Sequence, residues 1–107
     1  MDRVEKIDRA LNEVKKEIKK IEEYTEFNYE TGEYFAFESQ AIPAEEIIQI
    51  SENIIVADAG SIFEYKEDID DLFDIIEEIH DENSEIYGDL DTNSLYNALK
   101  KLEKSMK

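Results

Sequence analysis

The most distinctive chemical feature of the sequence is a segment in which Asp and Glu recur every three or four residues. Ten of the nineteen residues from Glu64 to Glu82 carry carboxylates, and Lys66 is the one Lys or Arg among them. Carboxylates in such an array can act as general acids and bases, ligate hard cations, or present negative charge to a cationic partner. Each of these functions needs further residues, which the rest of the sequence either supplies or lacks.

The residues that catalysis or metal binding would need are lacking. His80 is the only histidine and there is no cysteine, so neither a zinc site nor a recognisable nucleophile–base pair is present. The stretch 89–100 begins like an EF-hand loop, but Ser94 stands where glycine is needed and Lys100 where glutamate is needed. We therefore predict a protein that is not an enzyme and that has no cofactor and no metal site.

The acidic segment also has the pattern of an amphipathic helix from Glu67 to about His80. Its apolar residues share one side of a helical wheel: Ile69, Leu72, Phe73, Ile75, Ile76 and Ile79. We predict that a partner binds the acids of the opposite side and of the following loop: Glu67, Asp70, Asp71, Asp74, Glu77, Glu78, Asp81, Glu82, Glu85, Asp89 and Asp91. Like charges at this spacing cost a few tenths of a kcal/mol per pair, and a cationic partner would offset that cost.

A second apolar pattern marks the N-terminal segment as a long helix, with Asp2 as its expected N-cap. Apolar residues recur at alternating intervals of three and four for nearly three heptads: Val4, Ile7, Leu11, Val14, Ile18 and Ile21. Such a stripe either packs on a sheet of the same chain or forms the seam of a homodimer. The sequence leaves both interpretations open.

The middle of the chain predicts strands. Residues 27–37 have the pattern of a β-hairpin turning at Thr31 and Gly32, and the β-rich runs 53–57 and 62–65 predict a second pair of strands. A short helix is expected at 43–51, and a last helix is expected to follow a cap at Thr92 or Ser94. The predicted fold class is α+β in one domain, 1–107: a small antiparallel sheet of two hairpins, about four strands, packed by the N-terminal helix and two C-terminal helices.

The overall charge limits the choice of partner. The 107 residues carry a net charge of -17, and residues 21–96 hold 23 acids against Lys66 alone. Phosphates and anionic membranes would repel such a chain, whereas basic protein surfaces would attract it. The sequence shows no signal-peptide core and no apolar run of membrane-spanning length, so we predict a cytoplasmic protein. A generic solvated acidic surface would give the same composition.

In size, charge and lack of catalytic residues, the chain resembles the small phage-encoded inhibitors of host defence, which include DNA mimics that act on restriction enzymes and anti-CRISPR proteins. It is similarly close to the acidic immunity proteins that neutralise basic nuclease toxins. Both resemblances imply that carboxylates fill a site built for phosphate. We therefore expect a non-catalytic inhibitor that blocks the basic groove of a nuclease or another nucleic-acid-binding protein, in the host cytoplasm if phage-encoded. An immunity protein and a dimerising scaffold are the alternatives.

Overall fold

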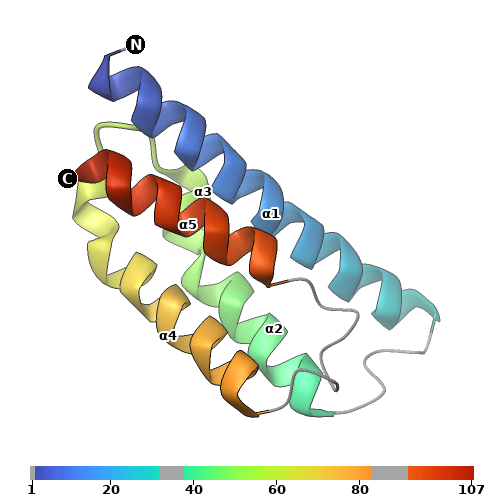
Figure 1. The fold of residues 1–107 in the computed structure, drawn as a ribbon. Coiled ribbons are helices and arrows are strands. Elements are labelled where there is room, and N and C mark those ends of the chain that lie inside the picture. The colour runs from blue at the N-terminus through green and yellow to red at the C-terminus, as the bar shows by residue number, and fades with distance from the viewer. Residues whose placement is uncertain (1, 32–37, 83–91) are drawn as a thin grey trace.

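The computed structural model of the 107-residue chain describes residues 2–31, 38–82 and 92–107 (Figure 1). Every element within these ranges is helical. The α-helices are α1 (Arg3–Thr31), α2 (Glu38–Ile50), α3 (Glu52–Val56), α4 (Lys66–Glu82) and α5 (Asn93–Met106), and a 3-10 helix, η1 (Ile62–Tyr65), precedes α4.

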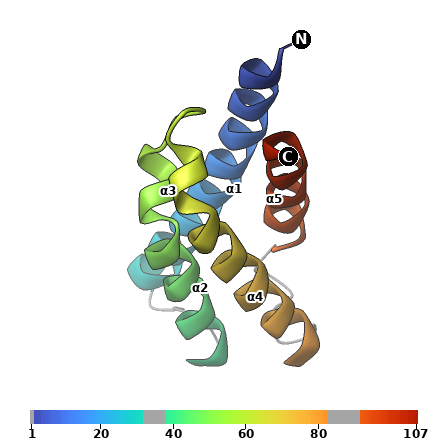
Figure 2. The same ribbon diagram turned by 90° about the vertical axis from the view of Figure 1, so that its left-hand side faces the viewer.

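The four longer helices form an antiparallel bundle. Helix α1 packs most extensively on α5 and α2 packs on α4, while contacts of α1 with α2 and of α4 with α5 join the two pairs. Neighbouring helices run in opposite directions, and α3 and η1 connect α2 to α4 (Figures 1 and 2). The longest dimension is 45 Å. It matches the length expected of the 29-residue α1 at about 1.5 Å per residue.

One hydrophobic cluster fills the centre of the bundle, and all four helices contribute to it. Val14 of α1, Ile47 of α2, Leu72 of α4 and Leu99 of α5 are each 0% exposed. Because each helix presents one apolar side, the side chains of the opposite sides remain in solvent. The charges of each helix therefore lie on the outer surface.

Helix α1 begins as the sequence predicts. The backbone N–H of Glu5 donates to Oδ1 of Asp2 at 2.9 Å, which is the hydrogen bond of an N-cap. The apolar stripe of α1 faces the core and packs mainly on α5. The stripe therefore contacts helices of the same chain in place of the expected sheet.

The prediction of an α+β fold is wrong, because residues 2–31, 38–82 and 92–107 contain no strand. Residues 27–31 continue α1, the run 53–56 belongs to α3, and 62–65 form η1. Runs of four or five apolar residues fit the period of a strand and one turn of a helix equally well. Burial decided between them, since Ile54 and Ile62 are both 0% exposed in the helical core. The remainder of the first predicted hairpin, 32–37, lies outside the described residues.

The other helix predictions are confirmed with shifted ends. Helix α4 starts one residue before the predicted Glu67 and ends two residues after His80. Helix α5 follows Thr92 and buries Leu95, Ala98, Leu99 and Leu102 as predicted. Helix α2 begins five residues before the predicted start at Pro43, so this proline lies inside the helix and not in its first turn.

Candidate interaction surface

Helix α4 is fixed to the bundle by its apolar side. Leu72 and Ile76 are 0% exposed and Ile69 is 3% exposed, so the direction in which α4 faces is set by the core. Glu67 and Asp68 in its first turn stabilise the positive end of the helix dipole. With the apolar side buried, the opposite side of α4 necessarily points into solvent.

Six predicted partner-binding side chains lie on this outer side, and all six are exposed: Glu67, Asp70, Asp71, Asp74, Glu77 and Glu78. We call them the α4 acidic face. Among the residues that the structure describes, no ion pair or hydrogen bond reaches any of these six side chains. The backbones of Asp81 and Glu82 are helical, and nothing is described of their side chains; Glu85, Asp89 and Asp91 lie outside the described residues.

The described ion pairs of the chain involve α1, α5 and Lys107, which follows α5. Lys20 contacts Glu17 at 3.1 Å within α1, and Lys101 of α5 contacts Glu13 of α1 at 3.4 Å. The pair of Lys107 with Glu103, at 4.0 Å, also belongs to the C-terminal segment. Within the described ranges, the lysines near the two chain ends thus do not neutralise the α4 acidic face.

The charge density of the α4 acidic face can be compared with that of a nucleic acid. Glu67 and Glu78 are eleven residues apart, a distance of about 17 Å along the helix axis. Six carboxylates over this length give about one charge per 3 Å, close to the roughly 3.4 Å per phosphate of one strand of duplex DNA. The face therefore resembles a short piece of one nucleic-acid strand in linear charge density.

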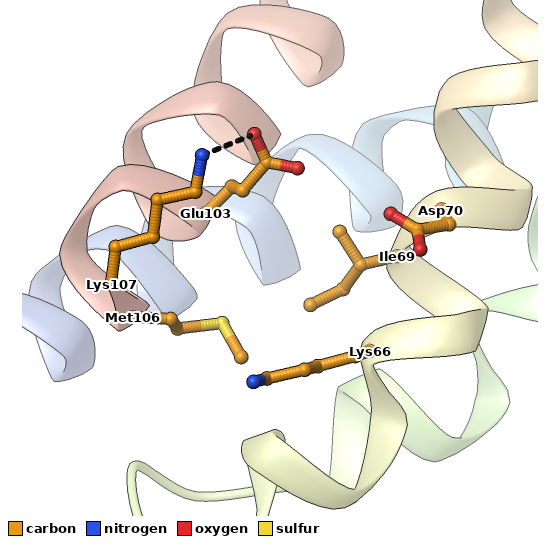
Figure 3. A pocket seen from close by; sticks show the side chains of 6 residues that line it. All are labelled: Lys66, Ile69, Asp70, Glu103, Met106 and Lys107. Atoms are coloured by element: carbon orange, nitrogen blue, oxygen red, sulfur yellow. Dashed lines mark ion pairs between the residues drawn. The ribbon is translucent and has the colours of Figure 1, made fainter.

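A groove of about 220 Å³ adjoins this face between the start of α4 and the end of α5 (Figure 3). Its apolar side chains are Ile69 and Met106, and its charged residues are of both signs: Lys66, Asp70, Glu103 and Lys107. Asp70 belongs to both the groove and the α4 acidic face. The groove has room for a side chain of a partner, and none of its lining residues is a histidine, serine or cysteine that could act as a nucleophile or neutral base.

A tight turn, Asp58–Ser61, precedes η1 and therefore α4. Oδ1 of Asp58 accepts hydrogen bonds from the backbone N–H groups of Ser61 at 2.8 Å and Gly60 at 2.9 Å. In return, the backbone N–H of Asp58 donates to Oγ of Ser61 at 2.9 Å. The hydrogen bonds from Ser61 and Gly60 favour the charged carboxylate and lower the pKa of Asp58. This carboxylate thus stabilises the turn and is separate from the α4 acidic face.

Sequence reasoning missed the aromatic contacts between the helices. Phe73 of α4 meets the ring of Tyr96 of α5 edge-on, with 5.4 Å between centroids, and Nζ of Lys100 lies 4.9 Å from the centroid of Tyr96. Near the start of α4, Arg3 and Lys66 lie 5.4 and 5.6 Å from the centroid of the Phe63 ring of η1. The sequence indicates these contacts in part, because the helical wheels of α4 and α5 place Phe73 and Tyr96 at the borders of the apolar stripes.

The predicted dimer seam is largely covered by the chain's own helices. Val4 is 59% exposed, whereas the other five residues are at most 3% exposed: Ile7, Leu11, Val14, Ile18 and Ile21. A second copy could contact these five only if the bundle opened. A homodimer stays a prediction, and it would have to use another surface of the folded chain.

The described residues contain neither a cluster of metal-ligating side chains nor a helix that could span a membrane. Within residues 2–31, 38–82 and 92–107 there is no group of three or more His, Cys, Asp or Glu residues placed to hold a metal ion. No helix in this part of the chain combines the length and the hydropathy of a bilayer span. The absence of catalysis, cofactor and metal, and the cytoplasmic location, remain predictions.

Comparison with known proteins assigns the chain to no family. No protein-family model, curated protein or solved structure matches the chain significantly. The class is therefore defined by the fold and the surface: an antiparallel helical bundle with an exposed array of carboxylates on α4.

Proposed function

We propose that this protein is a non-catalytic inhibitor whose α4 acidic face occupies a basic groove that another protein uses for nucleic-acid phosphates. One observation carries the proposal. Six exposed carboxylates share one side of α4, and no cation among the described residues is paired with them. A cationic groove would supply the missing counter-charges.

The distribution of charge supports an external partner. Eleven of the twelve Lys and Arg residues lie in residues 2–31 and 92–107. Within the α4 acidic face, only Asp70 has a lysine four residues away, Lys66, so the other five acids are left without the i,i+4 lysines that commonly stabilise a helix. Repulsion within the α4 acidic face costs on the order of 1–2 kcal/mol, a substantial part of a total stability of about 5–15 kcal/mol. Binding to a cationic surface would recover this free energy.

The spacing of the charges favours a protein that holds nucleic acid as the target. A groove built for phosphates presents cations at intervals set by the strand, and the α4 acidic face offers about the same charge per unit length. We infer that the target is a basic nuclease or another nucleic-acid-binding protein. Restriction and CRISPR effector nucleases fit this description, which makes an anti-defence role the specific form of the proposal.

Displacement of a nucleic acid from its own protein tests the proposal directly. A fluorescent oligonucleotide is bound to each member of a panel of basic nucleases, including restriction and CRISPR effectors, and this protein is titrated in while anisotropy is followed. Two variants with equal changes in net charge are compared with the wild type. The first reverses five acids of the α4 acidic face to Lys: Asp70, Asp71, Asp74, Glu77 and Glu78. The second reverses five exposed acids of α1 to Lys: Glu5, Asp8, Glu13, Glu23 and Glu26.

The wild type is expected to displace the oligonucleotide from at least one nuclease. The α1 variant should retain most of this activity and the α4 variant should lose it, although circular dichroism shows both to be folded. Equal loss in both variants would mean that net charge alone matters. The proposal would be contradicted if the α4 variant displaced the oligonucleotide at the same concentration as the wild type. It would also be contradicted if the wild type displaced the oligonucleotide from none of the nucleases.

A further inference from the structure

The contact line between α4 and α5 contains an aromatic ring that already binds a cation. We call this line the α4–α5 seam and define it by these residues: Lys66, Asp70 and Phe73 of α4, with Tyr96, Lys100 and Glu103 of α5 and Lys107 directly after α5. Because the two helices are antiparallel, Tyr96 lies against Phe73, whereas Glu103 and Lys107 share the groove with Asp70 and Lys66. Lys100 lies along α5 between these two contacts.

The ring of Tyr96 is held in place. Phe73 contacts it nearly perpendicularly, at an interplanar angle of 85°, and both rings are partly buried against the core. The ammonium of Lys100 lies 4.9 Å from the centroid of this ring. An aromatic face so placed attracts cations through its quadrupole. In the folded chain, therefore, one exposed lysine occupies a site that is suited to a cation.

Arginine suits this site better than lysine does. Its planar guanidinium stacks on an aromatic face and can at the same time donate hydrogen bonds to a carboxylate, which a point-like ammonium does less well. Asp70 lies one turn before Phe73, lines the adjoining groove and has no ion pair or hydrogen bond among the described residues. The groove leaves room beside Asp70 for an incoming side chain (Figure 3).

We propose that the α4–α5 seam is an arginine-binding site, in which a guanidinium of the partner protein takes the place of the Lys100 ammonium over Tyr96 and donates hydrogen bonds to Asp70. The inference rests on the proposed function for the nature of the partner, a basic protein. Charge complementarity selects the occupant, since the adjoining α4 acidic face draws in cationic side chains. Lys100 then competes with the partner, and its removal should strengthen binding.

Short peptides serve as probes that do not require the partner to be known. Affinities of the full chain for octa-arginine and octa-lysine are measured by isothermal titration calorimetry. The key variant is Lys100→Met, and its matched control is Lys104→Met, an exposed residue one turn further along α5 with the same change of charge. Tyr96→Leu removes the ring. Tyr96→Phe keeps the ring and serves as the variant that should preserve both fold and binding.

The wild type is expected to bind octa-arginine more tightly than octa-lysine. Lys100→Met should tighten octa-arginine binding roughly two- to fivefold more than Lys104→Met does, which is the size of one exposed cation–π contact. Tyr96→Leu should remove the preference for arginine, and Tyr96→Phe should keep it. If Lys100→Met and Lys104→Met behave alike, or if Tyr96→Leu retains the preference, the arginine site is overturned.

The two proposals fail in different ways. If the wild type displaces the oligonucleotide from none of the nucleases, the proposed function is overturned, whatever the peptides show. Displacement by the wild type together with equal peptide binding by Lys100→Met and Lys104→Met overturns the arginine site alone. If Tyr96→Leu is unfolded by circular dichroism, the comparison of Lys100→Met with Lys104→Met still decides.

Discussion

The two halves of the bundle bury similar cores but carry very different surfaces. Residues 2–31 and 92–107, which form α1 and α5, hold eleven basic and ten acidic side chains; residues 38–82, which form α2 to α4, hold fifteen acidic side chains and Lys66. Both halves bury Ile and Leu completely. The charge difference is therefore not a requirement of the core, and folding alone does not explain it.

Several cations of the α1–α5 half make contacts within the fold. Nζ of Lys15 donates a hydrogen bond to the carbonyl of Ala57 at 2.6 Å, which ties α1 to the turn after α3. Arg3 donates to the carbonyl of Met106 and lies over the ring of Phe63. No comparable contact reaches the α4 acidic face from the described residues. Part of the charge of one half is thus satisfied within the fold, while the α4 acidic face of the other half is left available to a partner.

The largest expected effect tests whether the two halves share one core. Leu99→Ala in α5 and Leu72→Ala in α4 each remove a side chain that is 0% exposed. Each should lower the free energy of unfolding by about 2–5 kcal/mol, because the cavity is only partly refilled. Urea denaturation followed by circular dichroism gives the values, and Val4→Ala, at a site 59% exposed, is the control. A much smaller loss for Leu72→Ala would mean that the α2–α4 half contributes little to the common core.

The next largest effect concerns the hydrogen bond from Lys15 of α1 to the carbonyl of Ala57 in the other half. Lys15→Met keeps the methylene stem but removes the hydrogen bond to the carbonyl of Ala57. We expect a loss of about 1–2 kcal/mol in the free energy of unfolding, since this bond is charge-assisted and part-buried. Lys16→Met removes the same charge from an exposed neighbour and should have little effect. Similar losses in the two variants would show that the hydrogen bond does not stabilise the bundle.

Neutralising acids should stabilise the α4 acidic face but not α1. Asp74→Asn, Glu77→Gln and Glu78→Gln together should raise the free energy of unfolding by about 1 kcal/mol at low salt, because repulsion within α4 falls. The gain should shrink as salt screens the charges. A matched triple neutralisation in α1, at Asp8, Glu13 and Glu23, should bring no gain, since basic residues alternate with those acids. A gain of the same size in α1 would remove the distinction between the halves.

The smallest effect is a pH dependence at the turn before α4. Hydrogen bonds from Ser61 and Gly60 lower the pKa of Asp58 below its ordinary value of 3.8. The stabilisation is therefore fully present above the pKa of the unfolded chain, and it is lost as pH falls through the lower pKa of the folded chain. Asp58→Asn should lose less stability than the wild type between about pH 5 and pH 3. Because both proteins share the acids of α4, a difference in urea midpoint that stays constant with pH would contradict this role.

The long helices could be predicted from the sequence, and the short ones could not. The stripes of α1, α4 and α5 extend over several turns, so the helical period is distinguishable from the period of a strand. Helix α3 and η1 have five and four residues, little more than one turn each. Their β-branched and aromatic residues favoured strands locally, and only the burial of Ile54 and Ile62 in the assembled bundle made them helical.

The candidate site also has one part that the sequence could predict and one part that it could not. The α4 acidic face follows from the helical wheel of one segment, so the sequence was sufficient to predict it. The contact of Phe73 with Tyr96 and the position of Lys100 depend on the register between α4 and α5. No pattern within a single helix determines how two helices align, and these contacts required the three-dimensional structure.

The central claim is that the α4 acidic face binds a cationic groove, and the salt dependence of binding tests it most directly. The affinity of the wild type for a nuclease from the panel is measured at about 50 and about 500 mM salt, together with the α4 and α1 charge-reversal variants. We predict that the affinity of the wild type and of the α1 variant falls by at least about tenfold at the higher salt, while the α4 variant binds at neither. A wild-type affinity that does not change with salt would contradict the account.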